Sequence, residues 1–353
     1  MKSSATTSTT TSEKMLSITD LTVSFPTDDG VVHAVNGMSL SLGRGQTLGL
    51  VGESGSGKTV TGQALMGLLK DSSARISGQV LLDGQDLVPL PESAMRSLRG
   101  KKISMIFQDP LSAMHPFYPV GDQIAEAYLV HNQVPRKQAA AVAVDMLGRV
   151  GIPDPKRRAR AYPHEFSGGM RQRAMIAMAL VCEPELLIAD EPTTALDVTV
   201  QAQILDLIKD MQAETGTSVI MVTHDLGVVA EVCHEVAVMY GGMCVEQASV
   251  TDLFDNPRHP YTQGLLASMP AMTDESQRLT PIPGFPPSLL ALPDGCVFAD
   301  RCDQREKVPD NLCRTSRPAL FGAEHRSRCH LEVLDPPAAT PTAPMAQTEG
   351  GPQ

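Results

Sequence analysis

A glycine-rich segment at Gly52–Thr59 carries the clearest chemical pattern in this 353-residue chain. It fits G-x-x-x-x-G-K-[ST] in full, with the residues Gly52, Glu53, Ser54, Gly55, Ser56, Gly57, Lys58 and Thr59. Such glycines let the backbone curl so that successive N–H groups point at phosphate oxygens, and a following helix adds its positive end. Lys58 can reach the β- and γ-phosphates of a nucleotide, and the Thr59 hydroxyl can ligate Mg²⁺. Because an apolar strand precedes the segment and a helical run follows it, we expect a nucleotide phosphate site here.

An acidic pair ends a second apolar run, Leu186–Glu191. A buried strand there would deliver Asp190 and Glu191 at its carboxyl end, where α/β sheets bind ligands. Asp190 would hold Mg²⁺ through water, and Glu191 would orient or deprotonate an attacking water. Alone, such a pair is often only a helix cap. Together with the phosphate loop, it predicts a site for phosphate-ester chemistry.

Three further segments carry polar residues at the ends of regular elements. Ser167, Gly168 and Gly169 stand at the start of a helical run, which is a second anion-binding geometry. Gln108 follows the apolar strand Ile103–Phe107, and His224 follows Val219–Thr223. A chain with one nucleotide rarely needs two anion sites, so the second one requires an explanation.

The order of these motifs resembles that of ABC-type ATPases. The resemblance implies that Ser167–Gly169 binds the γ-phosphate of ATP held by an opposite subunit. It also implies that Gln108 senses Mg²⁺ and a membrane partner, and that His224 contacts the γ-phosphate. With Glu191, these two form the expected catalytic set. Ala195–Asp197 resembles the D-loop of the family, and Phe25 stands where the family places an aromatic ring that stacks on adenine.

Three residues depart from the family pattern. Phe166 and Met170 replace the usual Leu and Gln of the signature motif, but the Ser-Gly-Gly core between them is intact, so phosphate contact is still expected. His115 replaces the usual Asn of an Asn-Pro pair. It belongs to the loop expected to face the membrane partner, so it should affect coupling and spare hydrolysis.

The elements that must position these residues alternate along the chain. Strand-like runs alternate with longer helical runs, and this alternation indicates an α/β domain with a largely parallel sheet. The expected strands are Leu16–Phe25, Thr47–Val51, Ile103–Phe107, Leu186–Ala189, Val219–Thr223 and Val236–Tyr240, and the expected helices include Val60–Leu69, Met170–Val181 and Val200–Ala213. We therefore expect a disordered tail at 1–14, an ABC ATPase domain at 15–255 with a helical subdomain at roughly 109–180, a C-terminal extension at 256–331 and a second disordered tail at 332–353.

The extension is rich in proline, so long regular elements are improbable there. It resembles the extension of the ATPases of oligopeptide and dipeptide importers. The resemblance rests on four segments: Asn256–Thr262 with Gly264–Leu266, Pro283–Pro287, Gly295–Phe298, and Arg301 with Cys302. Because such a small domain has few apolar residues, it needs a source of stability other than a large hydrophobic core.

Four of the seven cysteines lie in this extension, at Cys296, Cys302, Cys313 and Cys329, separated by five, ten and fifteen residues. We call them the cysteine cluster. Four thiolates suit either tetrahedral Zn²⁺ or an iron–sulfur centre, and the spacing alone does not decide between them. The resemblance to peptide importers favours a 4Fe-4S cluster, with Zn²⁺ as the alternative and free or oxidised thiols as a third. Its role would be structural.

Composition limits the classes of partner. Lys and Arg number 29 against 40 Asp and Glu, a net charge of −11, so the chain is a poor candidate for binding a nucleic acid backbone. No stretch approaches 18 consecutive apolar residues, and the N-terminus lacks an apolar signal core. The resemblance to importer ATPases implies a peripheral protein at the cytoplasmic face of the cell membrane.

The resemblance implies a transport ATPase, which converts ATP and water to ADP and phosphate and so drives uptake of peptides across the cytoplasmic membrane. The expected partners are two transmembrane permease subunits, a second ATPase subunit that is homologous or identical, and indirectly an extracytoplasmic substrate-binding protein. The alternatives are a soluble ABC ATPase that acts on ribosomes, DNA or iron–sulfur assembly, and an importer motor for nickel, glutathione or another small solute.

Overall fold

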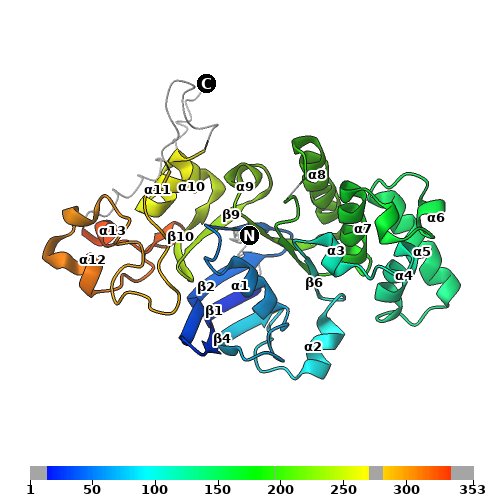
Figure 1. The fold of residues 1–353 in the computed structure, drawn as a ribbon, viewed down its shortest axis with the longest axis horizontal. Helices are drawn as coiled ribbons and strands as arrows, with labels where there is room; N and C mark the ends of the chain where they lie inside the picture. Colours follow the sequence, from blue (N-terminus) through cyan, green and yellow to red (C-terminus); the bar gives the residue numbers. More distant parts are fainter. Residues whose placement is uncertain (1–13, 195, 270–280, 335–353) are drawn as a thin grey trace, which may run out of the picture.

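The computed structural model describes residues 14–194, 196–269 and 281–334. Their α/β fold contains two sheets, and helices and a C-terminal extension surround them (Figure 1). None of the described helices is both long and apolar enough to cross a membrane. The expected tails lie mostly outside the described ranges, although Lys14 already belongs to the first strand and the last helix runs to Leu334.

The larger sheet has seven strands, in the order β11 (Arg326–Ser327), β10 (Met243–Ser249), β9 (Glu235–Tyr240), β3 (Thr47–Val51), β8 (Ser218–Thr223), β7 (Leu186–Asp190) and β6 (Ile103–Ile106). The five strands from β9 to β6 are parallel, and β10 and β11 are antiparallel additions. Every residue of β3, β7 and β8 is buried. Parallel strands covered on both faces need such continuous apolar runs, which is why the sequence predicts them well.

The strand expected at Leu16–Phe25 is present, but it belongs to a separate four-stranded antiparallel sheet that the sequence did not predict. The order of this sheet is β2 (Gly30–Gly43), β1 (Lys14–Thr27), β4 (Arg75–Leu82) and β5 (Gln85–Asp86). Buried and exposed residues mix along β1, as in a sheet with one face toward a core and one toward solvent. That pattern was the available signal for a second sheet.

Helices cover the larger sheet and build a lobe at one end of it. Between Pro110 and Leu180 every described regular element is helical, and Figure 1 shows this lobe on the right. It contains α3 (Pro110–Ala113), α4 (Val120–Leu129), α5 (Arg136–Arg149), α6 (Pro155–Arg158), the short turn η1 (Pro163–Glu165) and α7 (Gly168–Leu180). Elsewhere lie α1 (Lys58–Leu65), α2 (Glu92–Leu98), α8 (Val198–Thr215) and α9 (Leu226–Val232). The three helices named from the sequence are α1, α7 and α8, each with slightly different bounds.

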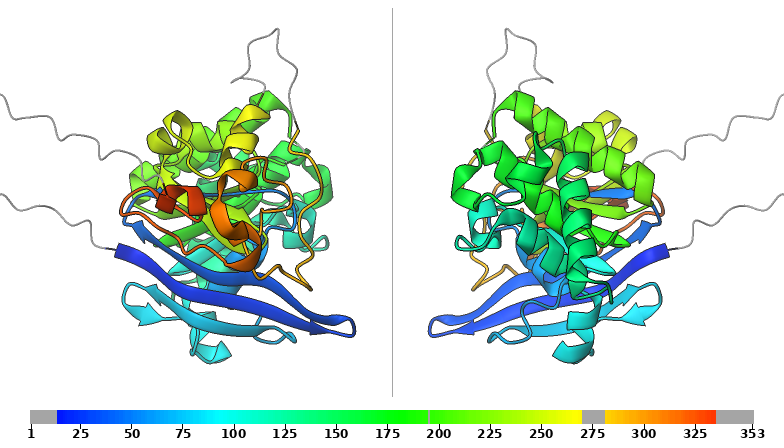
Figure 2. Two further views of the ribbon diagram at one scale, coloured as in Figure 1. Left: turned by 90° about the vertical axis from the view of Figure 1, so that its left-hand side faces the viewer. Right: turned by 90° about the vertical axis from the view of Figure 1, so that its right-hand side faces the viewer.

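The extension consists of short elements at the opposite end of the sheet (Figures 1 and 2). They are α11 (Pro260–Ala267), η2 (Arg305–Lys307), η3 (Pro309–Asn311), α12 (Leu312–Thr315) and α13 (His330–Leu334), and α10 (Val250–Asp255) comes just before them. The shortness of these elements agrees with the proline content. The extension also supplies β11, which pairs with β10 and so continues the ATPase sheet.

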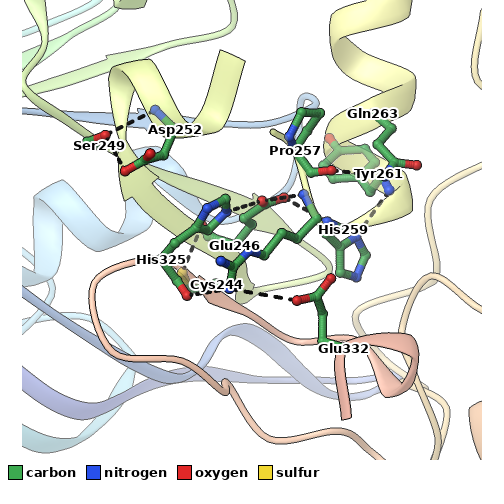
Figure 3. Close-up of polar contacts among 11 residues, drawn as sticks. Cys244, Glu246, Ser249, Asp252, Pro257, His259, Tyr261, Gln263, His325 and Glu332 are labelled. Atoms are coloured by element: carbon green, nitrogen blue, oxygen red, sulfur yellow. Dashed lines mark hydrogen bonds and ion pairs between the residues drawn. The ribbon is translucent and has the colours of Figure 1, made fainter. Parts of the chain in front are cut away.

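A buried carboxylate joins the extension to the sheet (Figure 3). Glu246 of β10 is fully buried and accepts hydrogen bonds from the backbone N–H groups of Arg258 at 2.7 Å and His259 at 2.9 Å. The His325 ring nitrogen lies 2.7 Å from the same carboxylate. Burial acts to raise the pKa of Glu246, but these hydrogen bonds outweigh it and the pKa is lowered. The carboxylate therefore stays ionised and ties three separate segments together.

Candidate functional site

The glycine-rich loop lies between β3 and α1, as the sequence predicts. Gly52 and Gly57 have φ angles of 150° and 102°. A Cβ atom would stand 2.1 Å from the carbonyl oxygen of Met239 at Gly52, and 2.2 Å from that of Ala34 at Gly57. Neither position accepts a side chain, because the loop is packed directly against neighbouring backbone.

Lys58 opens α1 and is buried. Its ammonium group donates to the carbonyl oxygens of Gly52 at 2.7 Å and Glu53 at 3.0 Å. Burial lowers the pKa of Lys58, and the carboxylates of Glu191 and Asp190 offset part of that effect. The lysine ammonium thus contacts the backbone of its own loop, and two nearby carboxylates act to raise its pKa.

Thr59 and Asp190 face each other across the site. The Thr59 hydroxyl donates to a carboxylate oxygen of Asp190 at 3.2 Å. Asp190 is buried, and this burial raises its pKa. A hydroxyl and a buried carboxylate are oxygen donors that suit Mg²⁺. These two residues therefore fit the expected magnesium site.

Glu191 is the meeting point of the expected catalytic residues. The Gln108 amide donates to its carboxylate at 2.9 Å, and Nδ1 of His224 lies 3.2 Å from the other oxygen. β6, β7 and β8 are neighbours in the sheet, so the residues that follow them meet at one edge. The Thr194 hydroxyl also donates to Glu191, at 2.9 Å. Sequence reasoning missed Thr194, although its position three residues after Glu191 was a usable signal.

The hydrogen bonds at Glu191 determine its charge. Partial burial acts to raise the pKa of this carboxyl, but hydrogen bonds from Thr194 and His224 outweigh it, so the pKa is lowered. Glu191 also adopts a left-handed backbone conformation, with φ of 47°, and its N–H donates to the carbonyl of Val222 at 2.8 Å. An ionised carboxylate is thus fixed in place beside Lys58 and Asp190.

The second anion-binding motif lies apart from the first. Ser167 caps α7, where its hydroxyl accepts the N–H of Met170 at 3.3 Å. Figure 1 places α7 within the helical lobe and α1 beside the antiparallel sheet. The chain therefore does not bring Ser167–Gly169 to its own phosphate loop. This separation fits an action on the nucleotide of another subunit, which stays a prediction.

Two other predicted positions remain open. Phe25 is half-buried at the end of β1, where it packs against the core beneath the antiparallel sheet and pairs with Val32. Its predicted stacking on adenine is untested. In the segment compared to a D-loop, Ala195 lies outside the described residues. Asp197 caps α8 by accepting the N–H of Val200 at 3.0 Å.

The cysteine cluster gathers around one small cavity. Burial raises the pKa of all four thiols, to about 11 for Cys296 and about 12 for Cys329. The cavity measures about 10 Å³, which is roughly the space that one water molecule needs. No three or more His, Cys, Asp or Glu side chains of the described ranges are placed so as to hold a metal ion. The thiols are thus neighbours of the right chemical type, in an arrangement that is not itself a metal site.

The neighbouring His330 is engaged elsewhere, since its ring nitrogen lies 2.8 Å from the carbonyl oxygen of Ser316. Two functional contacts that sequence reasoning missed come from the same extension, where Tyr261 and Arg301 reach the phosphate loop. Arg301 stands beside Cys302 in a segment already singled out, but nothing in the sequence pairs it with Glu53.

Comparison with family models gives two matches. The ABC transporter model matches residues 35–194, and the model for the C-terminal region of oligopeptide/dipeptide transporters matches residues 245–308. The first match contains the phosphate loop and the acidic pair. The second contains most of the extension before the last two clustered cysteines.

Curated relatives are similar over most of the chain. The dipeptide transport ATP-binding protein DppD of Bacillus subtilis is 54% identical over 85% of this chain and 90% of its own length. The oligopeptide transport ATP-binding protein OppD of Salmonella typhimurium is 50% identical over 84% of this chain and 88% of its own length.

Solved structures share the fold at lower identity. A dimeric ATP-binding cassette in a post-hydrolysis state with ADP and Pi is 24% identical, with a TM-score of 0.61 over 67% of this chain and 99% of that one. The cbiO1 protein of Clostridium perfringens is 29% identical, with a TM-score of 0.58 over 69% of this chain and 92% of that one. These likenesses confirm the fold class that the motifs predict.

Proposed function

Because the chain belongs to the family of ABC transporter ATP-binding subunits, we propose that it is the ATP-hydrolysing motor of a peptide importer. The similarity to dipeptide and oligopeptide transport proteins supports this proposal, and so does the match of residues 245–308 to the C-terminal region of such transporters. The soluble alternatives, which act on ribosomes, DNA or iron–sulfur assembly, gain no support from these relatives.

The observation that carries the proposal is the set of contacts at Glu191. An ionised carboxylate there, bound by Gln108, Thr194 and His224, is suited to orient a water molecule and take its proton. Lys58 and the backbone N–H groups of Gly52–Thr59 would bind the β- and γ-phosphates of ATP. Thr59 and Asp190, with Gln108, would hold Mg²⁺, which neutralises charge on the phosphates.

The test is Glu191→Gln, which keeps the shape of the side chain and removes the proton acceptor. Hydrolysis should fall by at least about 100-fold, while ATP still binds. A matched control is Glu185→Gln, which removes a half-buried carboxylate just before the same strand, where it contacts Lys102 and Arg44. The control should hydrolyse ATP normally. Near-normal turnover in Glu191→Gln would remove this residue from its role.

The remaining parts of the machine follow from the family. ABC ATPases of importers work as a dimer on membrane permeases, and we propose that Ser167–Gly169 of each subunit completes the ATP site of the other. Two transmembrane permease subunits would bind the loop around His115, where Phe117 and Tyr118 are exposed. An extracytoplasmic binding protein would deliver the peptide to the permeases. Co-purification with polytopic membrane subunits distinguishes this assembly from a soluble ATPase.

We propose that the cysteine cluster holds a 4Fe-4S group. Four thiols around one cavity support this assignment, since deprotonated cysteines are the usual ligands of iron–sulfur centres. The described cysteines are not themselves placed to hold a metal ion and their cavity is small, so they would have to move to bind the group. Its binding would reinforce an extension whose elements are all short. Stoichiometric zinc in the purified protein would replace this assignment by a structural zinc site.

A further inference from the structure

The second residue of the phosphate loop is bound by a residue 248 positions away in the sequence. Arg301, from the extension, donates from both terminal nitrogens to the Glu53 carboxylate, at 2.8 and 3.0 Å. This is the two-point geometry in which arginine fixes both the position and the orientation of a carboxylate. The pair connects the extension directly to Gly52–Thr59.

Arg301 is well anchored on its own side. Its side chain is only 6% exposed. The guanidinium also donates to the carbonyl oxygens of Pro283 at 2.8 Å and Ile282 at 3.1 Å, and to the Tyr240 hydroxyl at 3.2 Å. Because all five N–H donors of an arginine are then engaged, this side chain has one defined position. It cannot follow Glu53 if the loop moves.

A tyrosine of the extension binds the backbone of the same loop residue. The Glu53 N–H donates to the Tyr261 hydroxyl at 2.9 Å. Tyr261 belongs to α11, is fully buried, and packs on the ring of Tyr240 with centroids 4.5 Å apart. The side chain and the N–H of Glu53 are therefore both held by residues outside the loop.

The third polar group of Glu53, its carbonyl oxygen, contacts a residue of the nucleotide site. This oxygen accepts a hydrogen bond from the Lys58 ammonium at 3.0 Å. A shift of Glu53 would thus also remove one of the two loop carbonyl contacts of the lysine that is expected to bind phosphate. The contacts run without a gap from Arg301 and Tyr261, through Glu53, to Lys58.

We propose that Arg301 and Tyr261 are positioning residues that hold the phosphate loop in its nucleotide-binding shape. ATP affinity then depends on a folded, correctly docked extension. The inference rests on the proposed function in one respect, namely that this loop binds ATP. It adds that residues of the C-terminal extension preorganise the loop, so less of the binding free energy is spent on ordering it.

The experiment measures binding of a non-hydrolysable ATP analogue with Mg²⁺ to the full-length chain, together with the ATP dependence of hydrolysis. Arg301→Met should weaken binding about tenfold or more, because a buried charge-assisted pair is lost. Arg301→Lys should restore part of the affinity, since a lysine keeps the charge but not the two-point geometry. Tyr261→Phe, which removes one hydroxyl, should weaken binding about threefold.

Two readouts separate positioning from a general loss of structure. Maximal hydrolysis at saturating ATP should stay near the wild-type rate while KM rises, since neither residue belongs to the proposed catalytic set. In a double-mutant cycle, Glu53→Gln with Arg301→Met should cost little more than either change alone, because both remove the same interaction.

A matched control is Arg328→Met. Arg328 is also a partly buried arginine of the extension, and it donates to the carbonyls of Cys244 at 3.0 Å and Pro318 at 3.1 Å. No contact of Arg328 in the described structure involves the phosphate loop, so this variant should bind the analogue as the wild type does. Equal weakening by Arg328→Met and Arg301→Met would overturn the proposal, as would unchanged affinity in Arg301→Met or strictly additive effects in the cycle.

The outcomes also separate this inference from the proposed function. A wild-type chain that does not bind the analogue would contradict the ATP site itself. A wild type that binds, with a Lys58→Ala variant that does not, would support the site. Normal affinity in Arg301→Met and Tyr261→Phe would then refute the positioning role alone. If Arg301→Met does not fold, Tyr261→Phe and Glu53→Gln keep the test valid, since both nearly preserve side-chain shape.

Discussion

Lowering the pH should loosen the attachment of the extension through His259. This histidine caps α11, where Nδ1 accepts the N–H of Tyr261 at 3.1 Å, and it is 1% exposed (Figure 3). Burial lowers its pKa from 6.5 to about 4, and the nearby Glu246 carboxylate offsets only part of that effect. Its contribution to stability is therefore complete above pH 6.5 and is lost as the pH falls toward 4.

The two pKa values set the magnitude. At pH 5 protonation of this histidine shifts the folding equilibrium toward the unfolded chain by a factor of about 30, whereas at pH 8 it hardly changes that equilibrium. This factor corresponds to about 2 kcal/mol of unfolding free energy lost between pH 8 and pH 5. Other groups also titrate in this range, so the prediction concerns the difference between two variants.

The perturbation that isolates His259 is His259→Asn. An asparagine oxygen still caps the helix, but the side chain no longer takes up a proton. Urea unfolding followed by circular dichroism, at pH 8 and at pH 5, should show the wild type losing about 2 kcal/mol more than this variant. His164→Asn, which replaces an exposed histidine of η1, should keep the wild-type pH dependence. An equal loss in wild type and His259→Asn would refute the reasoning.

Three further changes test the site. Lys58→Ala should weaken ATP binding about 100-fold, because a buried charge-assisted contact is lost, and calorimetric titration would show an unchanged affinity if the loop is not the phosphate site. Ser167→Arg should leave ATP binding to one subunit intact but prevent the ATP-dependent dimer, as size-exclusion chromatography can report; a variant that still dimerises and hydrolyses would contradict the role given to this motif. In anaerobically purified protein, a 4Fe-4S group should absorb near about 400 nm, and any cysteine-to-serine change in the cysteine cluster should bleach it while ATP still binds. Iron and acid-labile sulfide analysis decides this last case, and protein without any metal would leave the thiols without the proposed role.

The residues that sequence reasoning identified correctly are those at the ends of parallel strands. Gln108, Asp190, Glu191 and His224 each follow a short apolar run, and such runs mark strands covered on both faces. Which of these side chains would touch depends on the order of strands in the sheet, and only the structure gives that order. The contact between Gln108 and Glu191 exists because β6 and β7 are adjacent.

The features that the sequence did not reveal have two physical causes. The antiparallel sheet was missed because its strands alternate imperfectly, with register shifts between β1 and β2 that blur the period. The contact between Arg301 and Glu53 was missed because no local pattern links residues so far apart. The cysteines were recognised as a group from their number and position, and the structure places them around one cavity.

The pairing of β11 with β10 has a consequence for the synthesis of the chain. β10 ends at Ser249, but the strand that covers its free edge begins only at Arg326, some 77 residues later. At 5–20 residues per second, a ribosome needs roughly 4 to 15 s to make that stretch. During this interval β10 presents an unpaired edge, and Glu246 has yet to meet His325. A nascent chain arrested before Arg326 therefore leaves the β10 edge of the ATPase sheet open to pairing with a neighbouring chain.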